Sequence, residues 1–399
     1  MTDESLSESD GPARAAGRIW TGLVIVVLAA AVVVLLGMLA TSIMERRWEA
    51  LRPALAVTPI ADWEPDNAVW GRNYPREYET YANGRITDTR TKFGGAFPRD
   101  YLEEDPLKVI LFAGYGFSKD YLQARGHYYA VQDVVKTKRV EAKFVAATCW
   151  TCKSTDVPRV MARDGIAKFY GANFHDLKKE ITHPIGCQDC HDPGTMRLRI
   201  TRPVLKEAYE ATGRDISKAT HQEMRSLVCA QCHVEYYFKK DPKNYLALPW
   251  TKGTSPEGMM AYYDEIDFHD YVHPVSGTAI VKSQHPDYEL YLTGIHAYRK
   301  VSCADCHMPY RSEGGVKFTD HHVQSPLLNI ANSCAVCHRW SEQEIRSRVE
   351  SIQTKVADAA LAAEDAVVKA HFDVAACMQA GATDQQLAPV RKAVRRAQF

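Results

Sequence analysis

The residues of this sequence that could do chemistry are its cysteines, because ten of the eleven fall into five Cys-x-x-Cys pairs. Four of these pairs are followed at once by a histidine. Two thioethers at this spacing can hold the edge of a porphyrin while the adjacent imidazole binds the iron. The sequence therefore predicts four covalently attached c-type haems. In chain order they are the second to fifth motifs, Cys187/Cys190/His191, Cys229/Cys232/His233, Cys303/Cys306/His307 and Cys334/Cys337/His338.

Other uses of paired cysteines explain these four motifs less well. Zinc sites also use paired cysteines, but zinc does not require a histidine directly after the second cysteine in every pair. Structural disulfides and thioredoxin-like redox pairs do not require that histidine either. We therefore interpret the motifs as haem attachment sites, with zinc as the remaining alternative.

The first pair differs from the others, because Cys149 and Cys152 are followed by Lys153 in the segment CWTCK. Taken alone, this pair could be a redox site or a chance occurrence. Beside four haem motifs it predicts a fifth haem, whose iron is bound by a deprotonated lysine amine. A changed proximal ligand indicates a changed task, and a catalytic haem must keep one axial position open.

Haems that only carry electrons need a second axial ligand, which must come from elsewhere in the chain. The sequence contains 15 histidines, and four of them belong to the motifs. Spacing alone does not choose among the other eleven.

The N-terminal part predicts a membrane segment. Residues 19–44 contain no charged side chain, and about 20 apolar residues are enough to span a bilayer as a helix. We expect an uncleaved transmembrane anchor, with a cleaved signal peptide as the main alternative and a buried soluble helix as another. Residues 1–18, which are acidic and rich in serine, predict a disordered cytoplasmic tail.

The elements that must position the haems are predicted to be mainly helical. The 49 basic and 49 acidic residues give no reason to expect a nucleic-acid partner. Residues 45–90 are rich in proline and predict an irregular linker and the first wrap of the domain. Residues 91–340 predict a haem-binding catalytic domain of short helices, whose core consists of haem as much as of side chains.

Residues 341–399 predict two long C-terminal helices. Ser341 and Glu344 form a capping box, and apolar residues follow at helical spacing to about Ala380, before Gly381. Thr383 opens a second helix, and the chain reaches Phe399 without a stop signal. We expect that the sequence is cut inside this helix.

The motifs together resemble one known family. CWTCK and four CxxCH motifs occur with LFAGYGFSKDY at 111–121, CHVEYYF at 232–238, KSQHP at 282–286 and CADCHMPY at 303–310. This set resembles the pentahaem cytochrome c nitrite reductases, which form ammonia. The resemblance covers about residues 60–399 and does not include the N-terminal helix. It implies six-electron reduction of nitrite to ammonium at the lysine-ligated haem.

The resemblance also implies which side chains face nitrite. These are Arg139 in KTKRVEA, Tyr236 in VEYYF and His285 in KSQHP. The arginine would offer a fixed cation to the anion, the histidine a proton and a hydrogen bond, and the tyrosine a proton donor or a radical-quenching phenol.

A calcium ion beside the pocket is a further feature that the resemblance implies. Its ligands would be the side chains of Glu235 and Gln284 and the backbone carbonyls of Tyr236 and Lys282, which are all oxygen donors.

For the distal haem ligands the resemblance implies His127 for the third haem, His321 for the second and His296 for the fifth. His322 is a weaker alternative to His321. The distal ligand of the fourth haem, at His307, lies beyond the equivalent of Phe399 in the family. We expect either a truncated chain or a partner or a water molecule at that position.

The resemblance implies a membrane quinol dehydrogenase, a tetrahaem cytochrome, as electron donor and a homodimer formed through the helix that begins at Ser341. Haem attachment outside the cytoplasm predicts that the domain faces the periplasm from the bacterial cytoplasmic membrane. Two alternatives stay open: a multihaem electron-transfer cytochrome, and a related oxidoreductase that reduces hydroxylamine or sulfite.

Overall fold

The structure is a computed structural model that describes residues 12–51 and 58–399, with the side chains of 20–44 and 58–399. Residues 1–11 of the expected tail and residues 52–57 of the expected linker lie outside the described residues. The chain divides into two units. One contains Met1–Ala56 and Ser312–Val316, and the other contains Val57–Arg311 and Lys317–Phe399.

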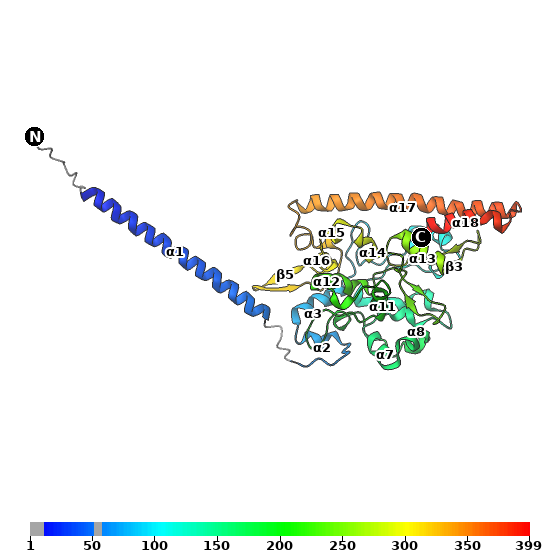
Figure 1. Ribbon diagram of the computed structural model, residues 1–399, viewed down its shortest axis with the longest axis horizontal. Helices are drawn as coiled ribbons and strands as arrows, with labels where there is room; N and C mark the ends of the chain where they lie inside the picture. Colours follow the sequence, from blue (N-terminus) through cyan, green and yellow to red (C-terminus); the bar gives the residue numbers. More distant parts are fainter. Residues whose placement is uncertain (1–11, 52–57) are drawn as a thin grey trace, which may run out of the picture. The chain divides into compact units, whose positions relative to one another are not determined.

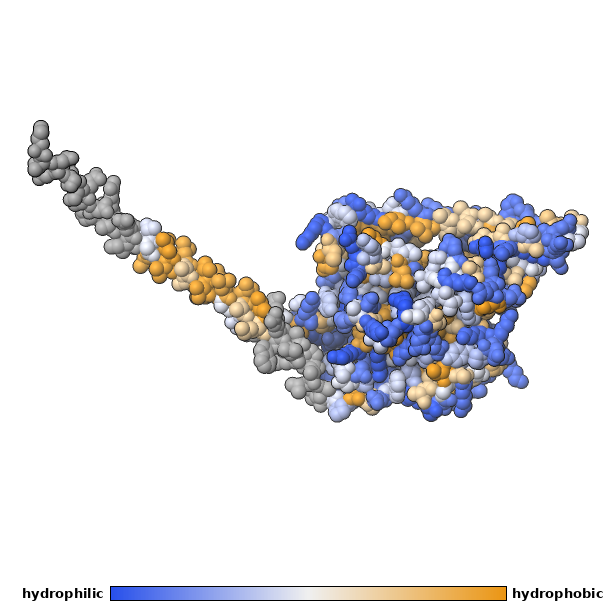
Figure 2. Space-filling model, viewed as in Figure 1, coloured by the Kyte–Doolittle hydropathy of each residue, from blue (hydrophilic) through white to orange (hydrophobic). Residues whose placement is uncertain are grey.

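The N-terminal unit contains one long helix, α1 (Pro12–Leu51). Within its segment Trp20–Met44, an 18-residue window has a mean hydropathy of 3.2, and no residue of the segment is buried within the protein. Figure 2 shows apolar side chains in orange along the visible face of the helix, and the sequence 20–44 contains no charged residue for any other face. A helix that is apolar on every side and packs on no core is typical of a membrane span or a signal sequence. The predicted apolar helix is therefore confirmed.

The larger unit is mainly helical, as predicted, and most of its helices are short (Figure 1). The prediction that residues 45–90 are irregular was wrong in part. Asp66 caps a helix there by accepting a hydrogen bond from the backbone N–H of Ala68 (2.8 Å), and Pro75 opens the next helix at a position where its fixed φ is favourable.

The α-helices of this unit before the C-terminal pair are α2 (Asn67–Gly71), α3 (Pro75–Ala82), α4 (Tyr101–Glu104), α5 (Leu107–Leu111), α6 (Ala130–Lys136), α7 (Val157–Asp164), α8 (Ile166–Gly171), α9 (Phe174–Leu177), α10 (Cys187–Cys190), α11 (Pro203–Ala211), α12 (His221–Ala230), α13 (Pro256–Glu265), α14 (Asp287–Leu292), α15 (Ile295–Tyr298) and α16 (Cys303–His307). The 3-10 helices are η2 (Asn83–Arg85), η3 (Gly116–Ser118), η4 (His127–Tyr129), η5 (Lys138–Val140), η6 (Ala147–Trp150), η7 (Ile216–Lys218) and η8 (Pro326–Leu328).

The strands form two-stranded hairpins that the sequence did not predict. They are β1 (Tyr237–Phe238) with β2 (Leu246–Ala247), β3 (Tyr271–Val272) with β4 (Ala279–Ile280), and β5 (Tyr310–Glu313) with β6 (Val316–Thr319). In the first two, Tyr237 faces Ala247 and Tyr271 faces Ile280 in antiparallel register. Strands this short carry no alternating pattern that a sequence could reveal. They fix the chain just after Tyr236 and just before Lys282.

The main hydrophobic core surrounds Trp150, which lies inside the first motif. Its indole is fully buried, stacks on the ring of Phe174 at 4.1 Å and donates a hydrogen bond to the Phe174 carbonyl (3.1 Å). Val157, Leu205, Leu227 and other buried side chains of α7, α11 and α12 complete this core. The attachment motifs therefore rest on a packed scaffold of short helices.

The C-terminal helices agree with the prediction in their bounds. α17 (Glu342–Gln379) begins at a Ser341 cap and is followed by Gly381 at φ +90°, and α18 (Asp384–Gln398) begins at a Thr383 cap. α18 folds back beside α17 (Figure 1). The expected apolar stripe of α17 is only partly core, because Ile352 and Val356 in its middle are 64% and 65% exposed. On α18, Leu387 and Val394 are buried, whereas Val390 is exposed.

Candidate functional site

Three of the four motif histidines face a second imidazole at one common distance. Two imidazoles bound to opposite sides of one metal ion have ring centres about 6.3 Å apart, since each metal–nitrogen bond is about 2.0–2.1 Å long. All ten motif cysteines are free thiols. The residues therefore fit covalent haem with one iron in each pair. The ring-centre distances are 6.4 Å for His127 and His233, 6.2 Å for His191 and His321, and 6.2 Å for His296 and His338.

Hydrogen bonds to the backbone orient several of these rings. The Nδ1 atoms lie close to a backbone carbonyl oxygen, and an Nδ1–H donated to it leaves Nε2 free to bind a metal. Burial also lowers the pKa of His127 and of His191 to about 4, which keeps both imidazoles neutral, as ligation requires. The oriented pairs are His191 with Met196 (2.9 Å), His321 with Thr319 (2.7 Å) and His307 with Gln324 (2.9 Å).

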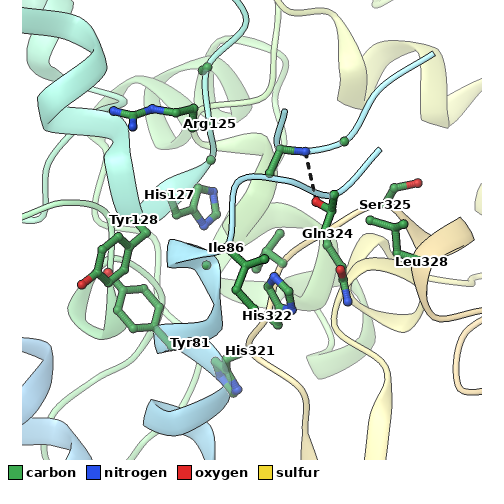
Figure 3. Close-up of a pocket in the computed structure, with 17 residues that line it drawn as sticks. Tyr81, Ile86, Arg125, His127, Tyr128, His321, His322, Gln324, Ser325 and Leu328 are labelled. Carbon is green, nitrogen blue, oxygen red and sulfur yellow. Dashed lines mark hydrogen bonds between the residues drawn. The ribbon is translucent and has the colours of Figure 1, made fainter. Parts of the chain in front are cut away.

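His321 and His322 are adjacent in the chain but differ in their surroundings. Both line a pocket together with His127, Tyr81 and Tyr128 (Figure 3). Among the described residues, the ring of His321 lies at the iron-spanning distance from another imidazole, whereas the ring of His322 does not. His307 has no such imidazole partner among them either.

Cys337 in the fifth motif differs from the other nine motif cysteines, because it is exposed while they are half-buried. The reason is that the fifth motif lies at the border of a small apolar cluster, which Cys334 and Ala335 contact, while Val336 and Cys337 turn outward. A haem thioether at Cys337 stays a prediction. The predicted site histidines that are also exposed are His233, His285, His296 and His307.

The first motif gathers the polar side chains that the resemblance implied for the nitrite pocket. η6 carries Cys149, and Lys153 follows it, while Tyr236 precedes β1 and His285 follows β4. The rings of Tyr236 and His285 are 6.2 Å apart. Desolvation, followed by the positive charges of Lys153 and Lys282, lowers the pKa of His285 to about 3. His285 is therefore a neutral hydrogen-bonding group at neutral pH.

The phenol of Tyr236 stays protonated. Burial, together with the nearby thiols of Cys152 and Cys149, raises the pKa of Tyr236 well above its usual range. A phenol of this kind can donate a hydrogen bond at the face of the first motif.

Arg139 reaches the same motif from η5. Its Nε atom donates a hydrogen bond to the hydroxyl of Thr137 (3.0 Å), and its guanidinium lies 4.1 Å from the ring centre of Phe117. Burial raises the pKa of the Cys149 thiol, and the charge of Arg139 opposes this shift. The cation of Arg139 is therefore close enough to act electrostatically on the first motif.

Sequence reasoning missed other groups near these side chains. Tyr115 stacks on Tyr271 at 4.9 Å, and the Lys282 ammonium lies 4.4 Å from the ring centre of Phe117. Burial raises the pKa of Asp270 to about 6 and lowers that of Lys282 to about 8. Tyr115 and Phe117 lie in the motif at 111–121, which was visible but had no assigned role. Asp270 had no sequence signal.

Glu235, the carboxylate among the expected calcium ligands, is fully buried and contacts the backbone of Gln284, another expected ligand. Its carboxylate accepts hydrogen bonds from the hydroxyl of Tyr263 (2.9 Å) and from the backbone N–H of Gln284. Burial raises the pKa of Glu235 to about 8, because its negative charge lacks full compensation. The described residues contain no cluster of three or more His, Cys, Asp or Glu side chains suited to a metal ion. A cation here would depend on amide and carbonyl oxygens, which suit calcium.

Thiols of different motifs also lie near one another. In each case one thiol is close enough to shift the pKa of the other. Porphyrins attached through these sulfurs would have neighbouring edges. The sulfur neighbours are Cys152 with Cys232, Cys190 with Cys232, Cys229 with Cys303, and Cys306 with Cys334.

Comparisons with known proteins agree on one family. The family model for cytochrome c552 matches residues 66–399. The cytochrome c-552 of Bacteroides fragilis is 50% identical over 390 residues, which are 95% of this chain and 78% of the relative. That of Porphyromonas gingivalis is 47% identical over 388 residues, with the same shares. A solved cytochrome c nitrite reductase of Desulfovibrio desulfuricans is 33% identical with a TM-score of 0.80, covering 85% of this chain and 79% of that one. Its catalytic subunit is described as having two calcium sites.

Proposed function

The chain belongs to the cytochrome c552 family and is an ammonia-forming cytochrome c nitrite reductase, and from this premise we propose that nitrite is reduced at the motif of Cys149, Cys152 and Lys153. The observation that carries this proposal is the convergence of Arg139 and the Tyr236–His285 pair on that motif. When bound there, a lysine-ligated haem supplies an open iron position and the electrons for the reduction.

The three polar side chains have separate tasks. The guanidinium of Arg139 holds the nitrite anion by charge and by a planar set of donors. Neutral His285 donates a hydrogen bond to a nitrite oxygen, and Tyr236 donates from its phenol. Because the pKa of His285 is about 3, its ring is a neutral imidazole at neutral pH, with one N–H to donate and no extra proton to give up. The protons consumed by the reaction must therefore come from water.

The electron route follows from the sulfur neighbours. Cys152 and Cys232 join the first and third motifs, and Cys229 and Cys303 join the third and fourth. The fifth motif neighbours the fourth through Cys334 and Cys306, and the second motif neighbours the third through Cys190 and Cys232. Four haem sites arranged in this way can deliver the six electrons without release of an intermediate. We propose His127, His321 and His296 as distal ligands, which their ring distances to the motif histidines support.

A calcium ion is proposed beside the pocket, bound by Glu235, Gln284 and the carbonyls of Tyr236 and Lys282. The raised pKa of the buried Glu235 carboxyl supports this proposal, since a divalent cation would compensate its charge. Tyr236 would then connect the cation to the nitrite pocket, because it contributes its carbonyl to the one and its phenol to the other.

The remaining proposals concern location and partners. A periplasmic location is typical of the family, and we propose that α1 is retained as a membrane anchor, with a tetrahaem quinol dehydrogenase as donor. The exposed apolar residues Ile352 and Val356 on α17 support a homodimer formed through this helix. We also propose that the domain limits lie at residues 18, 44, 90 and 340.

The test is an ammonium assay on purified holoprotein with nitrite and a reduced viologen. We expect Tyr236→Phe and His285→Asn to lose about 10²–10⁴-fold in ammonium formation at unchanged haem content. His175→Asn is the matched control, because its partly exposed ring bonds the Ala142 carbonyl (2.8 Å) instead of a pocket side chain. A wild-type protein that carries all its haems, forms no ammonium and has a fully low-spin spectrum would be an electron carrier instead. Relative rates with hydroxylamine and sulfite separate the related reductase activities.

A further inference from the structure

Arg202 has the most deeply buried guanidinium of the attachment region, with an exposed fraction of 0%. Its Nε donates to the carbonyl of Thr151 (2.6 Å), and one terminal nitrogen donates to the carbonyl of Ser154 (2.9 Å). These two carbonyls bracket Cys152 and Lys153 in the chain. One rigid fork therefore holds the backbone on both sides of the proximal lysine.

The same guanidinium reaches the second motif. The nitrogen that binds Ser154 also donates to the carboxylate of Asp189 (2.6 Å), which is the third residue of the second motif. Asp189 is 2% exposed, and its other oxygen accepts the backbone N–H of Gly186 (2.8 Å). The ion pair thus connects two haem attachment sites and is buried at both partners.

The backbone of Arg202 is fixed by the third motif. The side-chain oxygen of Gln231, which lies between Cys229 and Cys232, accepts the backbone N–H groups of Thr201 (3.0 Å) and Arg202 (3.2 Å). Its nitrogen donates to the carbonyl of Asp189 (2.9 Å). One buried node of side chains therefore connects the first, second and third motifs.

The charge of Arg202 lies beside the first motif, because its guanidinium is bonded to the carbonyls of Thr151 and Ser154. A guanidinium stays protonated in a protein, so this positive charge is permanent. A permanent cation in a buried region favours the more negative state of any redox group beside it, which for haem iron is the ferrous state.

We propose that Arg202 is a positioning residue for the lysine-ligated haem, because it fixes the backbone on both sides of Lys153 and because its charge favours the ferrous state there, with Asp189 opposing it. This inference rests on the proposed function, since it takes Lys153 as an iron ligand. The inference means that one buried ion pair, Arg202 with Asp189, influences the ferrous-to-ferric equilibrium at the catalytic site and contacts the second haem site as well.

The test is a redox titration of holoprotein variants, with the high-spin signal of the lysine-ligated haem followed by electron paramagnetic resonance. A unit charge at about 10 Å and an effective dielectric constant of about 20 changes a one-electron equilibrium on the order of tenfold. We expect Arg202→Gln to lower the ferrous-to-ferric ratio at fixed potential about tenfold, which corresponds to about 59 mV. Asp189→Asn should change this ratio in the opposite direction.

Arg202→Lys separates charge from position. It keeps the cation but has no planar fork to hold both carbonyls, so we expect a much smaller change in potential together with an altered high-spin line shape. Arg199→Gln is the matched control. Arg199 bonds the Gln188 carbonyl (3.3 Å) in the second motif and is not bonded to the lysine segment, so its replacement should move neither readout.

The outcomes are distinct. If Arg202→Gln loads haem and shifts the potential no more than Arg199→Gln, the inference is overturned. If Arg202→Gln fails to load haem, the other two variants decide. An opposite shift of the ferrous-to-ferric ratio in Asp189→Asn and an altered high-spin line shape in Arg202→Lys support the inference, and the lack of both overturns it. A wild-type protein without any high-spin signal overturns the proposed function itself.

Discussion

Replacing His321 with alanine is expected to open one axial position at the second haem, while replacing His322 leaves every haem unchanged. The two histidines are neighbours in one segment, and the sequence alone does not decide between them. The ring of His321 is 6.2 Å from that of His191, which matches two imidazoles on one iron. His321 is also oriented by the carbonyl of Thr319 (2.7 Å). The ring of His322 has neither feature among the described residues.

The size of the effect follows from the number of motifs. One of five haems should change from low spin to high spin in the His321→Ala protein, so the high-spin signal should rise by one haem per chain. The backbone should keep its place, because the N–H of His321 donates to the Thr80 hydroxyl (2.9 Å) and this bond does not use the side chain. Added imidazole should enter the opened space and restore the low-spin spectrum.

The assay is quantitative electron paramagnetic resonance of oxidised holoprotein, normalised to haem content, with and without imidazole. The control is His322→Ala, measured in parallel. The reasoning would be refuted by equal high-spin gains in both variants, or by a His321→Ala spectrum identical to that of the wild type at full haem loading. Either result would mean that the 6.2 Å spacing does not identify an axial pair.

Three further predictions concern the pocket, the cation and the pH dependence of stability. Arg139→Lys should raise the KM for nitrite about tenfold with a smaller change in kcat, because lysine lacks the planar donors that hold an anion; steady-state kinetics would contradict this if only kcat fell. Glu235→Gln should reduce calcium affinity at least about tenfold, since it removes the one carboxylate of the proposed site. Elemental analysis after dialysis measures this, with exposed Glu265→Gln as control, and equal calcium in both variants would argue against the site. Burial lowers the pKa of His371 to about 4, and its ring stacks on His273 at 3.6 Å. The unfolded chain therefore binds a proton near pH 6.5 that the folded chain does not bind, so the free energy of unfolding should fall by up to about 3 kcal/mol from pH 6.5 to pH 4. Denaturant titrations should show a weaker pH dependence in His371→Gln, and an unchanged slope would contradict the assignment.

The helical fold was predictable because its signals are local. A cap at Ser341, a stop at Gly381 and a second cap at Thr383 each depend on residues a few positions apart, and the helix bounds followed from them. The hairpins were not predictable, since strands of two to four residues are too short to leave a clear periodic pattern. The burial of α17 was not predictable, because the exposure of Ile352 and Val356 and the burial of Val367 depend on which segments fold beside them.

By itself the sequence determined the chemistry of the attachment sites. Two cysteines and an axial ligand within five residues form one unit in any fold, so the five motifs and the exceptional Lys153 could be read directly. Only the tertiary structure decided the pairings and the burial of each motif, including the exposure of Cys337. The distances from His321 to His191 and from Tyr236 to His285 join residues far apart in the chain. Arg202, an ordinary arginine in the sequence, became the buried link among three motifs only once packing had excluded water around it. Contacts of this kind depend on the path of the whole chain, which no local pattern encodes.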